Sequence, residues 1–248
     1  MTWSLEAHVV DHCNLRCAHC CTLSPGLQPR YTSPAALRRD LTLAARAVAP
    51  ALLKLTGGEP LLHPELAACL DASRESGIAD QISLTTNGHL AHRVSDAVFE
   101  RLDRLTLSLY PSAPLSDARL AALEERCERH GVLLRVKWMH RFGRMDAPRP
   151  SARRARAVHA ECWLRVRCHL VHEGRFYACT RPPHLADVRG EPELAQSDGV
   201  SLEAPDLLER VRALLESDEP HASCSVCLGA SGAREPHSQL AAGSGTSG

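Results

Sequence analysis

Residues 6–20 read Glu-Ala-His-Val-Val-Asp-His-Cys-Asn-Leu-Arg-Cys-Ala-His-Cys, an apolar, strand-like stretch that runs directly into three cysteines. Cys13, Cys17 and Cys20 have the spacing C-x3-C-x2-C, so one loop carries all three thiols. Thiolates this close together can converge on one soft metal centre. A four-iron cluster normally takes four cysteines, so three leave one iron open to another ligand. The loop therefore predicts a reactive iron–sulfur centre in preference to a structural zinc site, which favours a closed shell of four ligands.

The bulk composition argues against several classes of protein. The 248 residues include 29 Lys or Arg and 29 Asp or Glu, and zero net charge argues against a general nucleic-acid or anionic-membrane surface. No apolar run approaches the ~20 residues of a membrane span, and the N-terminus lacks a secretory-signal pattern. Eleven cysteines without an export signal indicate metal or redox chemistry in a reducing compartment, so we expect a cytoplasmic protein.

Strand-like and helix-like segments alternate from the start to about residue 140. Strands are expected at residues 6–10, 52–56, 81–86, 105–109 and 132–138, with helices between them. This alternation is typical of parallel strands with crossover helices, in a doubly wound sheet or a barrel. The G-x-G-x-x-G fingerprint is missing, and five units are too few for a closed eight-unit barrel. We therefore predict the α/β class, with a partial (β/α)6 TIM-type barrel that a sixth strand could complete.

Several polar or glycine-rich segments follow the expected strands. The run Thr56-Gly57-Gly58-Glu59-Pro60 ends the second strand. Alone it is a plausible turn, but glycines also let backbone approach a ligand, and a glutamate can pair with a cationic amine. The segment 85–88, Thr-Thr-Asn-Gly, and Ser108 end the next two strands and could be ordinary turn and cap chemistry.

The cysteine loop and the T-G-G-E-P segment, one βα unit apart, together resemble the radical S-adenosylmethionine (SAM) superfamily. The resemblance implies that Cys13, Cys17 and Cys20 hold a [4Fe–4S] cluster whose open iron binds SAM. His19 occupies the position of an aromatic residue that packs near the adenine in that family. The residues expected to contact SAM are His19, Gly57, Gly58, Glu59, Asn87 and Ser108, with Thr86 a weaker candidate.

A second cysteine group begins with Cys162, followed by Gly174 as a hairpin turn and by Cys179, and it ends with Cys224 and Cys227. Spacing alone leaves a four-cysteine zinc site open. The layout resembles the SPASM domain or its shortened twitch form, which implies an auxiliary [4Fe–4S] cluster. The remaining cysteines, Cys21, Cys69, Cys127 and Cys168, are expected to be small apolar residues, although Cys168 could donate a hydrogen atom to a substrate radical.

Domain boundaries are expected at residues 1–145 for the radical SAM barrel, 146–230 for the auxiliary-cluster region and 231–248 for a disordered tail. Lys137, His140, Arg141 and Arg144 follow the fifth strand, where a barrel places substrate contacts. We expect Lys137 or Arg144 to act on the substrate, with Cys168 as a further candidate.

The resemblance implies that a 5′-deoxyadenosyl radical abstracts hydrogen from the substrate. The short chain with one auxiliary site is similar to the 2-deoxy-scyllo-inosamine dehydrogenases, which implies oxidation of an alcohol on a small sugar or cyclitol. Few residues precede the first strand, which also favours a small-molecule substrate, and we expect a flavodoxin or ferredoxin as reductant. Three alternatives stay open: a sugar or nucleoside epimerase or dehydratase, a peptide maturase, and a non-enzymatic module with two zinc sites.

Overall fold

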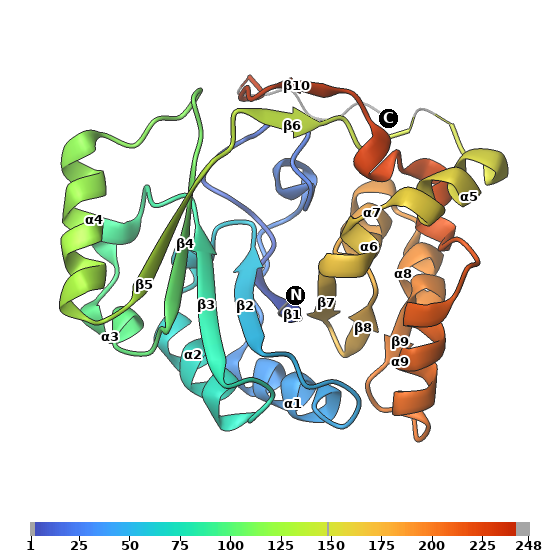
Figure 1. Ribbon diagram of the computed structural model, residues 1–248, viewed down its shortest axis with the longest axis horizontal. Coiled ribbons are helices and arrows are strands. Elements are labelled where there is room, and N and C mark those ends of the chain that lie inside the picture. Colours follow the sequence, from blue (N-terminus) through green and yellow to red (C-terminus); the bar gives the residue numbers. More distant parts are fainter. Residues whose placement is uncertain (1–2, 148, 242–248) are drawn as a thin grey trace.

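The computed structural model describes residues 3–147 and 149–241, and its centre is one eight-stranded sheet in the order β5-β4-β3-β2-β1-β7-β8-β9 (Figure 1). Strands β1 to β5 are parallel and follow one another in space as they do along the chain. Their bounds are Ser4–Val10, Leu52–Gly57, Gln81–Thr86, Arg104–Leu109 and Leu133–Trp138. These five strands confirm the α/β class and lie within a residue or two of the expected positions.

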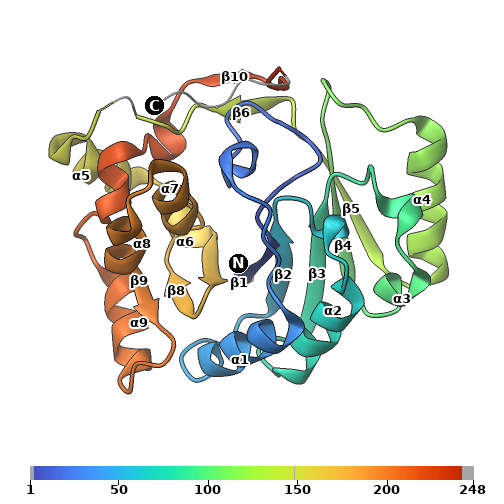
Figure 2. The same ribbon diagram turned by 180° about the vertical axis from the view of Figure 1, so that it is seen from behind.

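Helices connect these strands, as parallel pairing requires. They are α1 (Pro34–Ala44), α2 (Leu66–Glu75), α3 (Asp96–Phe99) and α4 (Asp117–Arg129), with short 3₁₀ turns η1 (Ser24–Gly26), η2 (Pro60–Leu62) and η3 (Ala91–Arg93). The side chains of Ser33 and Ser116 cap α1 and α4 by accepting backbone N–H groups. Figure 2 shows α1 and α2 against the back of the sheet. Leucines of β1 to β4, including Leu5, Leu53, Leu84 and Leu107, are fully buried and form the core between the layers.

The C-terminal half extends the same sheet on the other side of β1. Strand β7 (His169–His172) pairs in parallel with β1, and β8 (Arg175–Tyr177) and β9 (Gly199–Ser201) follow in antiparallel pairing. Gly174, at φ 72°, makes the expected hairpin turn between β7 and β8. The sixth parallel strand thus lies beside β1, and the sheet remains an open partial barrel with β5 and β9 at its edges.

The helices of this half gather beside the hairpin (Figure 1). They are α5 (Ala152–Glu161), α6 (Leu164–Arg167), α7 (Pro182–Arg189), α8 (Pro192–Asp198) and α9 (Leu207–Glu216), with η4 (Ala222–Val226) and η5 (Gly229–Ser231). The expected division at residues 145/146 remains a prediction, because one sheet runs through both halves. In the two described segments, no helix is long and apolar enough to cross a membrane.

A two-stranded ribbon crosses above the C-terminal ends of the main strands (Figure 1). It pairs β6 (Arg141–Gly143) with β10 (Arg234–Pro236). After β10, the backbone N–H of Ala18 donates to Ser238 and that of Leu240 donates to Arg16, at 2.9 and 2.7 Å. The expectation of a disordered tail is therefore wrong for residues 231–241, because their backbone hydrogen bonds are made to β6 and to the cysteine loop. Residues 242–248 of that expected tail lie outside the described residues.

Candidate active site

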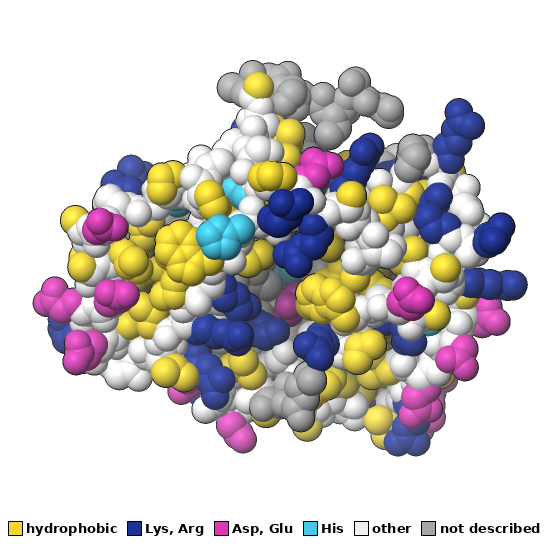
Figure 3. Space-filling model, turned by 45° about the horizontal axis from the view of Figure 1, so that its top comes forward, with side chains coloured by type: hydrophobic (Ala, Val, Ile, Leu, Met, Phe, Trp, Pro, Cys, Tyr) yellow, Lys and Arg dark blue, Asp and Glu magenta, His cyan; other side chains and the backbone are white. Residues whose placement is uncertain are grey.

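A cavity of about 420 Å³ opens at the C-terminal ends of the parallel strands, beneath the β6–β10 ribbon. Parallel α/β folds place functional groups at this edge, because the loops after successive strands meet there. Basic side chains gather around the hollow in Figure 3, and the cavity lining includes Lys54, Lys137, Arg141 and Arg234. The cavity is therefore the place to look for each residue that the sequence singled out.

The cysteine loop forms one wall of this cavity. Cys13, Cys17 and Cys20 all line it, on the loop that leaves β1. Burial raises the pKa of Cys13 to about 12 and that of Cys17 to about 11, so iron binding has to displace protons from both thiols. Gln239, which the sequence did not single out, donates from Nε2 to Cys17 Sγ at 3.3 Å and accepts the Arg16 N–H at 2.7 Å. The C-terminal segment thus holds the middle of the loop.

The two glycines of the T-G-G-E-P segment allow β1 and β2 to approach each other at their ends. A Cβ at Gly57, whose φ is +130°, would lie 2.1 Å from the Val10 carbonyl oxygen. One at Gly58 would lie 1.9 Å from the carbonyl oxygen of His12, next to Cys13. The backbone N–H of Gly58 donates to Val10 and that of Glu59 to His12. Both glycines line the cavity as expected, but their contacts within the chain already require glycine.

Glu59 lies at the cavity wall with its side chain almost fully buried. Its Oε1 accepts the Leu61 N–H and the Thr86 hydroxyl at 3.0 and 2.6 Å, and its Oε2 accepts the Asn87 N–H at 2.8 Å. Burial raises the pKa of this carboxyl, against the effect of the three donors. The carboxylate that was expected to meet a cationic amine therefore ties the end of β2 to the end of β3 in this structure.

The other expected SAM contacts also reach the cavity. Asn87 donates from Nδ2 to Asn14 Oδ1 at 2.8 Å, next to Cys13, and Ser108 lies near the end of β4. His19 lines the cavity and adopts a positive φ of 60°. Its Nε2 lies 3.1 Å from a carboxylate oxygen of Glu235, a residue that does not belong to the described lining. These positions bring all six candidates to one chamber, and their roles toward SAM stay predictions.

The three candidate catalytic residues divide between the cavity and the exterior. Lys137 and Cys168 line the cavity, whereas Arg144 is exposed and does not belong to the described lining. Burial, with the charges of Arg135 and Lys54, lowers the pKa of Lys137, which raises the fraction of neutral amine that can accept a proton. Glu6, which the sequence did not single out, also lines the cavity and lies 3.7 Å from the Lys54 ammonium.

The second cysteine group comes together beyond the far wall of the cavity. Cys162 follows α5, Cys179 follows β8, Cys224 lies in η4 and Cys227 follows it. Cys227 Sγ accepts the Gly229 N–H at 3.2 Å, and a Cβ at Gly229 would lie 3.1 Å from Cys162 Sγ. Of the nearby residues, Trp163, Leu164, Cys168 and Gly229 line the cavity. The chamber therefore reaches from the first cysteine loop to the surroundings of the second group.

Two buried charged residues support this arrangement, and neither was predicted. Asp198 accepts the N–H groups of Ala222 and Ser223 at the start of η4, at 2.7 and 2.9 Å. Arg181 is 1% exposed and donates to the carbonyl oxygen of Cys21 at 2.9 Å and to Asp146 at 2.6 Å. Arg181 follows Cys179 by two residues and so connects the two cysteine groups with a buried positive charge. Only their positions in the fold reveal these roles, because neither lies in a recognisable motif.

The spacing of the cysteines differs from that of a single-ion site. A single-ion site needs at least three His, Cys, Asp or Glu side chains whose ligand atoms lie close together. Within residues 3–147 and 149–241, one such group has all its ligand atoms within 4.8 Å of one another, and it contains no cysteine. Four thiolates around one zinc ion, at ~2.3 Å from the metal, would satisfy that limit easily. Thiolates of a four-iron cluster bind different irons and lie farther apart. Neither cysteine group is therefore arranged around a single-ion centre among the described residues.

Residues 8–117, a little under half of the chain, match the Radical SAM superfamily. This segment contains the cysteine loop, the T-G-G-E-P segment, Asn87 and Ser108, and it belongs to that superfamily. Membership implies a [4Fe–4S] cluster and SAM as cofactors.

The individual relatives cover different parts of the chain. GTP 3′,8-cyclase of Mycobacterium marinum is 37% identical over 111 residues, which are 42% of this chain and 30% of that protein. The GTP 3′,8-cyclase of Microcystis aeruginosa is 33% identical over 112 residues, with 42% and 33% covered. The chain thus spans about a third of the length of these curated relatives. The crystal structure of BtrN in complex with AdoMet and 2-DOIA has a TM-score of 0.53 at 15% identity, over 93% of this chain and 94% of that one, which shows a shared fold.

Proposed function

We propose that the chain is a radical SAM oxidoreductase that oxidises an alcohol of a small sugar or cyclitol to a ketone. One observation carries the proposal: a single cavity is lined both by Cys13, Cys17 and Cys20 and by residues next to the second cysteine group, such as Leu164 and Gly229. A substrate in this chamber would lie between a place where a radical starts and a place that could accept an electron. The similarity in fold to BtrN, solved with 2-DOIA, supports this substrate class over nearly the whole chain.

The residues present fit the two groups that the proposal needs. Cys13, Cys17 and Cys20 would hold the first [4Fe–4S] cluster, which, with SAM on its open iron, supplies a 5′-deoxyadenosyl radical when reduced. Cys162, Cys179, Cys224 and Cys227 would hold a second cluster, which supplies an acceptor for one electron. A flavodoxin or ferredoxin is proposed as the external reductant. Arg181 would offset the negative charge that thiolate-bound clusters place in this buried region.

The cavity wall offers groups that suit a polar, hydroxylated substrate. Glu6 can accept hydrogen bonds from hydroxyl or amino groups, and Lys54 and Lys137 can donate to hydroxyl oxygens. Loss of a hydrogen atom and then of one electron from a secondary alcohol carbon leaves one proton to be removed from the hydroxyl group. Lys137 is the proposed acceptor, because burial lowers its pKa and so favours the neutral amine.

A second candidate, redox-neutral epimerisation, rests on Cys168. This thiol lines the cavity, and burial raises its pKa, so it stays protonated and can donate a hydrogen atom. The GTP 3′,8-cyclase relatives match less than half of this chain and about a third of their own length, so they support SAM chemistry and not a cyclase reaction here.

Cys224→Ala and Cys168→Ala separate the two candidates, with the buried Cys127→Ala as the matched control. The assay is anaerobic reconstitution followed by measurement of 5′-deoxyadenosine and of oxidised product from a panel of aminocyclitols. We expect about eight irons per wild-type chain, intact SAM cleavage but no product in Cys224→Ala, and a mild effect of Cys168→Ala. Product loss confined to Cys168→Ala would contradict the dehydrogenase and favour the epimerase. A colourless zinc protein that forms no 5′-deoxyadenosine would contradict both.

A further inference from the structure

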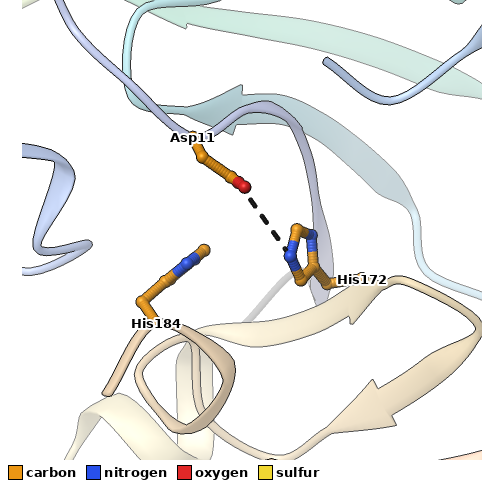
Figure 4. Close-up of side chains that lie close together, drawn as sticks. All are labelled: Asp11, His172 and His184. Carbon is orange, nitrogen blue, oxygen red and sulfur yellow. Dashed lines mark ion pairs between the residues drawn. The ribbon is translucent and has the colours of Figure 1, made fainter. Parts of the chain in front are cut away.

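Three buried side chains from distant parts of the chain converge beside the cysteine loop (Figure 4). Asp11 follows β1, His172 ends β7 and His184 lies in α7. Their exposed fractions are 3%, 4% and 0%, and their ligand atoms all lie within 4.8 Å of one another. Asp11 Oδ1 faces His172 Nε2 at 3.9 Å, too far for a hydrogen bond.

The imidazole nitrogens at this point lack the partners that buried polar atoms normally have. Neither ring nitrogen of His172, nor Nδ1 of His184, has a hydrogen-bond partner among the described residues. Leaving a buried polar atom unpaired is costly, and such atoms are rare in native folds. Three unpaired nitrogens around one carboxylate therefore point to a ligand at their centre.

The neighbouring hydrogen bonds orient His184 for metal binding. His8 Nε2 faces the Thr180 hydroxyl at 3.2 Å and the Glu6 carboxylate at 4.0 Å, which favours a proton on Nε2. His8 Nδ1 then accepts the N–H of His184 Nε2, at 2.6 Å. This assignment leaves Nδ1 of His184 as a free lone pair. Metal-binding histidines commonly use their second nitrogen in this way, to fix tautomer and ring orientation.

The local charge favours a divalent cation. Two guanidinium groups lie near the site. Arg30 pairs with Asp11 Oδ2 at 2.6 Å, with Glu173 at 2.5 Å and with Asp187, and Arg181 pairs with Asp146 at 2.6 Å. Four carboxylates against these two guanidinium groups leave two negative charges, and Asp11 Oδ1 remains free to bind an ion. A doubly charged metal would neutralise this cluster.

We propose that Asp11, His172 and His184 form a mononuclear site for a divalent transition-metal ion, with zinc as the best fit. Two imidazoles and one carboxylate are a donor set that zinc and iron(II) both accept. All three ligands are buried, and a water molecule would complete the tetrahedral shell that zinc prefers. Asp11 precedes Cys13 by two residues and His184 follows Cys179 by five, so the ion would fasten the first cysteine loop to the second cysteine group. The site is separate from both cysteine groups and does not depend on the proposed reaction.

His172→Gln is the decisive variant, because neither ring nitrogen of His172 has a hydrogen-bond partner in the described structure and its replacement removes a metal ligand alone. His130→Gln, near the end of α4 beside Asp96, is the matched control. Anaerobically reconstituted proteins are incubated with zinc, desalted and analysed for zinc and iron by mass spectrometry. X-ray absorption at the zinc edge then identifies the ligands.

We expect about one zinc per chain in the wild type and in His130→Gln, with nitrogen and oxygen neighbours at about 2.0–2.1 Å. In His172→Gln, zinc affinity falls by at least ~100-fold while iron content stays unchanged. Zinc should also raise the wild-type Tm by about 5–10 °C when free zinc is one hundred times its Kd.

Three results would overturn the proposal. The first is a sulfur neighbour at ~2.3 Å, which assigns the zinc to cysteines. The second is equal zinc binding in His172→Gln and wild type. The third is a wild type that takes up no zinc and shows no change in Tm, which would mean that water fills the site. If His172→Gln does not fold, Asp11→Asn takes its place in the same comparison.

Discussion

Gly58→Ala is expected to break the contact that positions the first cysteine. The added Cβ would lie 1.9 Å from the carbonyl oxygen of His12, whereas real Cβ contacts start at about 3.0 Å. The two backbone segments must separate by about 1 Å, which weakens the hydrogen bonds from the N–H groups of Gly58 and Glu59 to Val10 and His12. Two buried backbone hydrogen bonds and the added strain together cost on the order of 3 kcal/mol.

The expected outcome is a Tm lower by about 6–12 °C and a loss of about four irons after reconstitution, because His12 is the residue before Cys13. Gly131→Ala is the matched control. Gly131 has a φ of +67° with no atom within 4 Å of the added Cβ, so alanine there costs roughly 1 kcal/mol of backbone strain and leaves the iron content intact. Differential scanning fluorimetry and iron analysis measure both effects. A Gly58→Ala protein that matches Gly131→Ala in Tm and iron would refute the close-approach argument.

Two further predictions concern residues that hold the cysteines. Gln239→Leu removes the hydrogen bond to Cys17 Sγ. It should lower the reduction potential of the first cluster, since hydrogen-bond donors to the sulfurs raise that potential. An unchanged midpoint potential in an EPR-monitored redox titration would contradict this. Asp198→Ala leaves two backbone N–H groups of η4 unpaired, at a cost of about 2–4 kcal/mol, and should release Cys224. Iron analysis should then fall from about eight to about four per chain, and retention of all eight would exclude the role given to Asp198.

Local patterns account for what could be predicted from the sequence. The five strands of the first half were placed within a residue or two, because each is a short apolar run bounded by turn residues. Gly174 was placed in its hairpin for the same reason. The three cysteines of the first loop came together because they are close in the chain. Each of these features depends on sequence neighbours alone.

The features that were missed depend on contacts between distant segments. The pairing of β7 with β1 joins residues more than 160 positions apart, and no local pattern encodes a parallel partner. Residues 231–241 precede a small, polar C-terminal stretch and were predicted to be disordered with it, yet their order comes from hydrogen bonds to β6 and to the cysteine loop. The hydrogen bonds of Glu59 to Thr86 and Asn87 were not predicted, because these donors become neighbours of Glu59 only when β2 and β3 pair.

The pairing of β7 with β1 has a consequence for the proposed chemistry. The register joins Leu5 to His169 and Ala7 to Val171, so the loop after β1 and the hairpin that precedes Cys179 start from adjacent strands of one sheet. A hydrogen-bonded ladder between buried strands fixes their separation far more tightly than a linker between domains would. Arg181 adds a buried bridge from the second cysteine group to Cys21. The distance between a radical formed at the first loop and an electron acceptor at the second group is therefore a property of the folded sheet, and substrate binding does not have to create it.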